Sequence, residues 1–122
     1  MSRSVLLQLA RDSIQEVFQA KKTINIPSLL KEHPLLLEKI DIIINIYREN
    51  ELKSSYAITQ QKNSLANNII IGAKKVAFEN GEILTTSEYL HSEIELILHT
   101  PEGDIRQKDN AILNYSHFEQ IP

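Results

Sequence analysis

The sequence predicts one α+β domain over residues 1–122, in which an antiparallel sheet containing a β-hairpin packs against two main helices. Two long segments, 4–20 and 63–80, carry apolar side chains at helical spacing. Between them, residues 40–58 alternate apolar and polar side chains around a polar turn, which is typical of a hairpin. The length of 122 residues, with 42% hydrophobic and 24% charged residues, is that of a single globular domain.

Two helices come first in the chain. Residues 4–20 place one broad apolar arc around a helix. A short connection leads to a second helix, in which Pro27 suits the first turn and Asn25 suits the N-cap. Pro34 lacks the backbone N–H that a longer helix needs, so this second helix is short.

The hairpin follows. Residues 40–47 form its first strand, because β-branched residues recur there with a period of two. A polar turn at 48–51, in which Asn50 can adopt a positive φ angle, leads to the second strand at 52–58. Alternation along the second strand places four side chains on one face: Leu52, Ser54, Tyr56 and Ile58.

The second half of the chain starts with the most regular helix, residues 63–80, which Asn63 or Ser64 can cap. Gly72 lies on the apolar stripe of this helix, where the missing side chain allows close approach to a sheet.

A capping box formed by Thr85 and Glu88 predicts a further short helix. A strand over residues 92–99 follows, with its inward face formed by Ile94, Leu96 and Leu98. Residues 105–122 show no clear period, and we interpret them as a C-terminal tail.

Composition excludes several classes of protein. The chain has no cysteine, which rules out disulfides, thiolate zinc sites, iron–sulfur clusters and a cysteine nucleophile. Its net charge is −3, so the chain lacks the excess of basic residues that binds the phosphates of nucleic acids, and we expect no nucleic-acid partner. No apolar run approaches the ~20 residues that span a bilayer, and no signal peptide is evident. We therefore expect a cytoplasmic protein with no membrane partner.

No catalytic motif stands out. The four histidines lack the spacing of metal ligands, and the three isolated glycines form no phosphate-binding loop. His91, Glu93 and Glu95 recur at strand spacing and are interpreted as a solvated strand face. The sequence thus predicts no cofactor, no metal and no catalytic residue, and it favours a protein that is not an enzyme.

Ile71 and Phe78 lie off the main apolar stripe of the helix over 63–80. They are seven residues apart and therefore nearly in line, so they form a second, narrow apolar ridge. Either the N-terminal helix or the tail covers this ridge, or it is a contact surface for a second subunit or a protein partner.

Several stretches together resemble the AMMECR-type domain, the A component of the AmmeMemoRadiSam system. Residues 6–14 are similar to that family's opening helix, and residues 42–53 resemble the strands that lead into its signature. The strongest likeness is over 65–80, which resembles the family's helix ending "AxxAAFxD". Residues 84–101 resemble its "PLTxxEL…IEVSVLTPP" segment. The resemblance implies an α+β fold over roughly residues 4–105.

The chain departs from the family's signature of leucine, arginine, glycine, cysteine, isoleucine and glycine. Lys53 stands at the arginine, Ser54 and Ser55 at the glycine and cysteine, and Ala57 at the final glycine. These changes remove thiolate chemistry, close backbone approach to a ligand and the bidentate fork of arginine. The resemblance therefore implies the fold rather than an inherited catalytic site.

Two main functions follow as hypotheses, beside a third in which the chain is a degraded remnant with a structural role only. The first is a non-catalytic interaction or accessory module that binds a protein partner or forms a homo-oligomer, through the Ile71–Phe78 ridge or an exposed strand edge. The alternative is a small-ligand-binding protein or enzyme with a remodelled pocket at Lys53, Ser54, Ser55 and Tyr56. A concave site at the second strand would favour the alternative.

Overall fold

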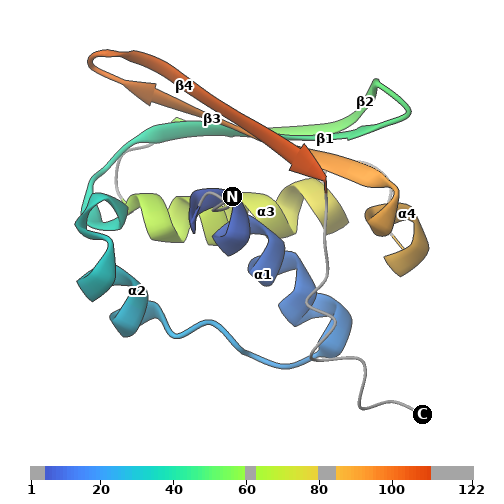
Figure 1. Ribbon diagram of the computed structural model, residues 1–122, viewed down its shortest axis with the longest axis horizontal. Helices are drawn as coiled ribbons and strands as arrows, with labels where there is room; N and C mark the ends of the chain where they lie inside the picture. Colours follow the sequence, from blue (N-terminus) through green and yellow to red (C-terminus); the bar gives the residue numbers. More distant parts are fainter. Residues whose placement is uncertain (1–4, 60–62, 80–84, 111–122) are drawn as a thin grey trace.

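The computed structural model describes residues 5–59, 63–79 and 85–110 (Figure 1). One antiparallel sheet with the strand order β2-β1-β3-β4 forms one layer, and the helices form the other. The fold class predicted from the sequence is confirmed. The elements are α1 (Val5–Gln19), α2 (Ile26–Glu32), the 3-10 helix η1 (Pro34–Leu37), β1 (Asp41–Arg48), β2 (Glu51–Ile58), α3 (Leu65–Phe78), α4 (Thr86–Leu90), β3 (Ser92–Thr100) and β4 (Gly103–Asn110).

All the described helices lie on one side of the sheet, and the opposite face carries none of them (Figure 1). The core lies between these layers, where Ile42, Ile44 and Ile46 of β1 are fully buried. At Gly72 of α3, an added Cβ would lie 2.9 Å from Ile44 Cδ1 and 3.5 Å from Ile58 Cδ1. The close approach predicted for this glycine is confirmed.

The predicted helix caps are also confirmed. Asn25 Oδ1 accepts a hydrogen bond from the Ser28 backbone N–H at 3.1 Å, and Ser64 caps α3. At α4, Thr85 and Glu88 form the complete capping box. These caps are local interactions, so a sequence pattern is enough to find them.

The β1–β2 hairpin contains a bulge that the sequence pattern does not show. Its turn residues Glu49 and Asn50 have positive φ angles of 55° and 63°. The register pairs Ile46 with Ser54 and then Tyr47 with Leu52, which leaves Lys53 as the extra residue. The prediction that Leu52 shares a face with Ser54 is therefore wrong. Leu52 lies with Tyr47 on the open face and is 54% exposed.

A fourth strand, β4, replaces the first part of the predicted tail. Residues 105–110 pair with β3, for example Ile105 with Leu98 and Lys108 with Glu95. The tail prediction is wrong for these residues, because an exposed edge strand needs no buried apolar stripe. The remainder of that segment, 111–122, lies outside the described residues.

A buried arginine holds the end of β4 against α1. Arg11 is fully buried, and its Nε and Nη2 donate hydrogen bonds to the Asn110 carbonyl at 3.0 and 2.8 Å. Nη2 also lies 3.2 Å from Asp109 Oδ2. Since α1 meets β4 at this end of the strand, the opposite end extends past α1, on the side of the molecule where η1 lies (Figure 1).

Candidate functional site

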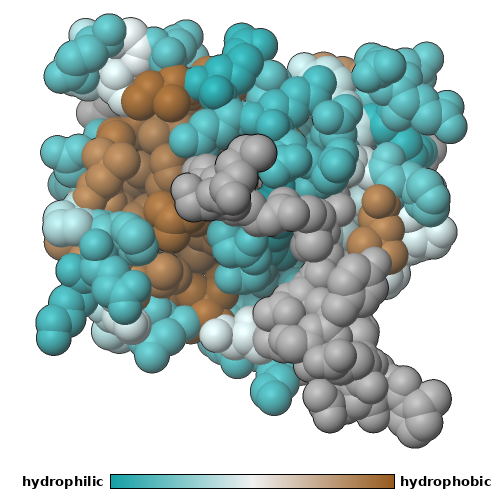
Figure 2. Space-filling model, viewed as in Figure 1, coloured by the Kyte–Doolittle hydropathy of each residue, from teal (hydrophilic) through white to brown (hydrophobic). Residues whose placement is uncertain are grey.

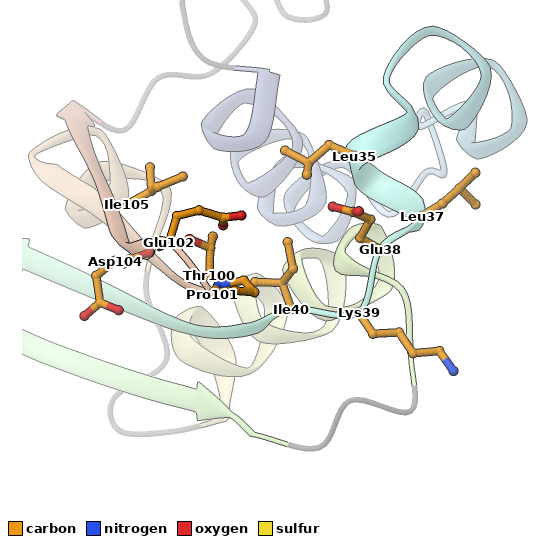
Figure 3. A pocket seen from close by; sticks show the side chains of 11 residues that line it. Leu35, Leu37, Glu38, Lys39, Ile40, Thr100, Pro101, Glu102, Asp104 and Ile105 are labelled. Carbon is orange, nitrogen blue, oxygen red and sulfur yellow. Dashed lines mark hydrogen bonds between the residues drawn. The ribbon is translucent and has the colours of Figure 1, made fainter.

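A large cavity lies where the turn end of β4 extends past α1. Its volume is about 720 Å³, and it separates η1 from the β3–β4 hairpin (Figure 3). We call its apolar lining the η1–β4 surface and define it by five residues: Leu35, Leu37, Ile40, Pro101 and Ile105. Ile40 is buried, whereas the side chains of the other residues are exposed.

The geometry of η1 explains why leucines are exposed here. Pro34 starts the single 3-10 turn, and the Leu65 backbone N–H donates to the Glu38 carbonyl at 2.7 Å, which ties the turn to α3. Within the turn, Leu36 points into the core and is fully buried. Its neighbours Leu35 and Leu37 must then point elsewhere, and they are 45% and 57% exposed.

β4 supplies the other wall of this cavity. Ile105 pairs with the inward-facing Leu98, so its side chain lies on the helix side of the sheet. None of the described helices covers it there, and Ile105 is 45% exposed. Figure 2 shows that hydrophobic surface gathers on the side of the molecule where η1 and α2 lie.

A second cavity continues this surface towards α1. It has a volume of about 360 Å³ and shares Leu35 with the first cavity. Gln107 of β4 lies on one side, and Val5 and Leu6 of α1 lie on the other. The uncovered strip beneath β4 is therefore longer than the first cavity alone.

Charged side chains surround the η1–β4 surface. Within the described ranges, Glu38, Lys39 and Glu102 have no ion pair or side-chain hydrogen bond. Asp104, in contrast, lies 2.8 Å from His99 Nδ1. In Figure 3 the Glu38 carboxylate projects towards the hairpin, whereas the Lys39 ammonium projects away from it.

The sequence reasoning did not find this site. Its two walls come from residues 35–40 and 100–105, which only the sheet pairing brings together. One signal was available: three consecutive leucines at 35–37 cannot all face one core from a short helical turn.

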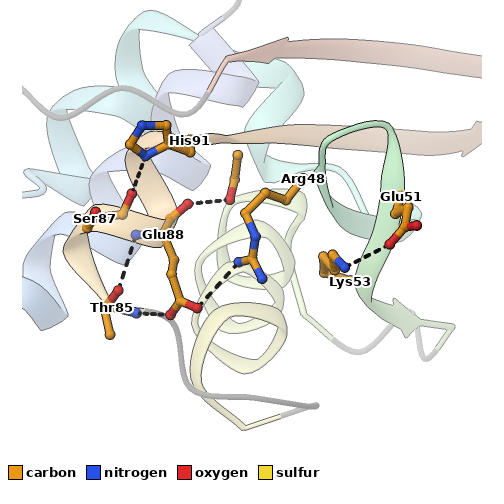
Figure 4. Close-up of polar contacts among 8 residues, drawn as sticks. Arg48, Glu51, Lys53, Thr85, Ser87, Glu88 and His91 are labelled. Carbon is orange, nitrogen blue, oxygen red and sulfur yellow. Dashed lines mark hydrogen bonds and ion pairs between the residues drawn. The ribbon is translucent and has the colours of Figure 1, made fainter.

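The four residues predicted to form a ligand pocket lie along β2, but they do not share a face. Ser54 and Tyr56 face the helices, whereas Ser55 faces the open side of the sheet. Lys53 occupies the bulge, and its Nζ lies 2.9 Å from Glu51 Oε2 (Figure 4). The structure therefore divides these side chains instead of gathering them around one ligand.

A cavity of about 410 Å³ does lie at the end of β2, but of the four predicted residues only Tyr56 lines it. Ile58 and Thr59 of the β2 segment form one side, and Asn68 and Ile71 of α3 form the other. This cavity lies on the helix side of the edge strand.

The predicted Ile71–Phe78 ridge consists of two different environments. The Phe78 ring packs edge-on against Phe18 of α1, with 5.3 Å between ring centres, and Phe18 in turn lies 5.6 Å from Tyr89. Ile71 is 39% exposed and lines the cavity near Tyr56. α1 thus covers Phe78, and the exposed part of the ridge is Ile71.

The expected solvated face of β3 is wrong for Glu95, which is only 3% exposed. Its Oε1 accepts hydrogen bonds from Asn45 Nδ2 at 2.8 Å and from the Tyr47 hydroxyl at 3.1 Å. Its Oε2 lies 3.3 Å from Arg106 Nη1. The Lys108 ammonium lies 4.1 Å from the centre of the Tyr47 ring. Burial, and then the hydrogen bond to Glu95, raise the pKa of the Tyr47 hydroxyl.

Polar contacts also fix α4 against the sheet (Figure 4). Glu88 accepts a hydrogen bond from the Thr85 backbone at 3.0 Å and lies 3.7 Å from Arg48 Nη1 of β1. His91 Nδ1 lies 2.8 Å from the Ser87 carbonyl. His91 therefore ends a helix rather than continuing the strand face with Glu93.

The described ranges contain no group of three or more histidine, aspartate or glutamate side chains placed to hold a metal ion. Likewise, none of the helices described in the structure is long and apolar enough to cross a membrane.

No protein-family model matches the sequence, and no curated protein matches it. Among solved structures, the chain is similar to the uncharacterized protein PH0010 from Pyrococcus horikoshii, with a TM-score of 0.68 and 23% sequence identity over 79% of this chain. The match covers 50% of PH0010, so this chain spans about half the length of that protein. A likeness at this identity shows a shared fold alone.

Proposed function

We propose that this chain is a divergent AMMECR-like domain that acts in the cytoplasm as a non-catalytic protein-interaction module. Its contact surface is the η1–β4 surface. The observation that carries the proposal is the exposure of three large apolar side chains, Leu35, Leu37 and Ile105, around one cavity. Clustered apolar groups at the surface are typical of protein contact sites, because contact removes them from water.

The AMMECR-like part of the proposal is supported by the sequence stretches described above. The interaction part is supported by the exposed apolar η1–β4 surface and by the arrangement of the residues of the alternative ligand pocket. Lys53 is paired with Glu51, and Ser54 and Ser55 face opposite sides of β2, so the geometry gives little support to a ligand pocket there.

Site-specific photocrosslinking tests the proposal. A photoreactive amino acid at position 37 is activated in the cells that make the protein. A matched probe stands at position 52, because Leu52 is also a leucine, is 54% exposed and lies at the opposite end of β1, next to the hairpin turn. We expect discrete crosslinked species from position 37 and none from position 52.

Two results would contradict the proposal. The first is no crosslinked species from position 37. The second is the same species from both positions, since contacts that do not depend on the surface are nonspecific. The masses of the crosslinked species separate a second copy of the chain from another protein.

A further inference from the structure

The η1–β4 surface has a hollow and a projection side by side. Leu35 and Ile105 wall the hollow, and Ile40 forms its floor. The projection consists of Leu37 and Lys39, which lie at the rim of the hollow and whose side-chain ends point away from the β3–β4 hairpin in Figure 3. Both parts belong to one continuous patch, because η1 and the two residues that follow it supply residues to each.

The charges of these two parts are opposite. Glu38 and Glu102 lie beside the hollow, and Lys39 lies on the projection. As noted above, none of these three side chains has a charged partner within the described ranges. Elsewhere in those ranges carboxylates commonly are paired, as in Glu16 with Lys74. The surface therefore presents an apolar residue next to a cation, and an apolar hollow next to two anions.

We infer that the η1–β4 surface binds a second copy of this chain across a two-fold axis. Leu37 and Lys39 of each copy occupy the hollow of the other copy, where Lys39 meets Glu38 and Glu102. This inference rests on the proposed function and names the partner for the same surface. A two-fold interface uses one patch twice and therefore requires a patch that is complementary to itself, as this one is.

Apolar contact and charge have different roles in this interface. Burying the exposed leucines and Ile105 supplies the affinity. The exposed ion pairs contribute little energy, but they reject registers in which like charges meet. Reversing Lys39, or reversing Glu38 and Glu102 together, therefore places like charges opposite each other in both halves of the dimer, and reversing all three charges restores attraction.

Light scattering over a range of concentrations tests the inference. The unmodified chain is expected to have twice the mass of one chain at high concentration. Lys39→Glu, and the paired change Glu38→Lys with Glu102→Lys, are each expected to weaken association by about tenfold or more, whereas the variant with all three changes recovers most of that loss. Lys22→Glu is the matched control, because Lys22 is exposed, lies outside the cavity and should leave association unchanged.

Four results would overturn the inference: a monomer at all concentrations, assemblies larger than two chains, charge-reversed variants that associate like the control, or a variant with all three changes that does not recover. The outcome for the proposed function is separate. If the unmodified chain is monomeric while the probe at position 37 captures a protein of another mass, the second-copy inference fails and the proposed function stands. If position 37 captures nothing, both fail.

Discussion

Glu16 joins three separate parts of the molecule through one carboxylate. Its Oε2 accepts hydrogen bonds from the backbone N–H groups of Thr23 and Ile24 at 2.7 and 2.9 Å. Its Oε1 accepts one from Lys74 Nζ at 3.1 Å. Burial alone would raise the pKa of Glu16, but these hydrogen bonds and the Lys74 charge together lower it below the usual 4.5.

This lowered pKa predicts a pH dependence of stability. Because the folded state prefers the ionised Glu16, its contribution is fully present above about pH 4.5 and is lost as the pH falls through the lower folded pKa. Glu16→Gln is expected to cost about 1–2 kcal/mol at pH 7 and to reduce the loss of stability on acidification. Urea unfolding at neutral and acidic pH measures both. An identical acid dependence in the variant would contradict this account.

Glu95 and Glu93 provide a matched comparison on one strand. Glu95→Ala leaves the Asn45 amide and the Tyr47 hydroxyl without their acceptor, and we expect a cost of about 1–3 kcal/mol in the free energy of unfolding. Glu93 makes no such contacts among the described residues, so Glu93→Ala should change stability by less than about 0.5 kcal/mol. Equal effects in chemical unfolding would mean that the Glu95 network does not stabilise the fold.

At the scale of single elements, the main feature of α3 is its close approach to the sheet at Gly72. Gly72→Ala combines a gain in helix propensity of about 1 kcal/mol with a forced shift of the Ile44 methyl group, so we expect a net change below about 1 kcal/mol. Gly72→Leu cannot be accommodated in the same way and should cost about 1–3 kcal/mol. Thermal unfolding compares them, and a Gly72→Leu variant as stable as the unmodified chain would contradict the close approach.

The orientation of α3 leads to a second element-scale prediction. Val76 is 1% exposed, so Val76→Asp buries an unpaired charge and is expected to prevent folding. Ile71→Asp is the matched control on the same helix, because Ile71 is 39% exposed. Circular dichroism should show helical structure for the control only. A folded Val76→Asp variant would show that the helix is rotated from the described orientation.

Local sequence patterns were enough to predict most helices and strands. The features that depend on pairing between distant strands could not be predicted in this way. The caps at Asn25, Ser64 and Thr85 depend on residues three positions away, so the sequence is sufficient for them. The bulge at Lys53 depends on the register against β1, and no local pattern encodes it. β4 could not be recognised by an apolar period, because this exposed edge strand carries mostly polar and charged residues.

The same limit applies to the candidate site. Leu35 and Ile105 lie far apart in sequence and become neighbours only because β4 pairs with β3 at the edge of the sheet. The four residues of the predicted pocket, in contrast, are close in sequence but do not surround one cavity. Residues adjacent along a strand alternate between its faces, so Ser54 and Ser55 are separated by the sheet itself.

At the scale of the whole molecule, helices cover one face of the sheet but do not cover all of it. The turn end of β4 extends past α1 (Figure 1), and the cavity beneath it is lined by the exposed leucines of η1 on the side of the molecule where hydrophobic surface gathers (Figure 2). Leu35, Leu37 and Ile105 do not belong to the hydrophobic core cluster, so the apolar strip is separate from the residues that hold the two layers together. A stable core together with a separate exposed apolar surface is the combination that the proposed interaction module needs.

Cysteine protection at position 37 tests the central claim most directly. The chain has no cysteine of its own, so Leu37→Cys carries a single thiol, and Leu52→Cys is its matched control. We expect both thiols to react rapidly with a maleimide in dilute purified protein, and only the one at position 37 to be protected in the cells that make the protein. Equal reaction of both positions in cells, or protection of position 37 in the dilute monomer, would show that this surface is not a contact site for another molecule.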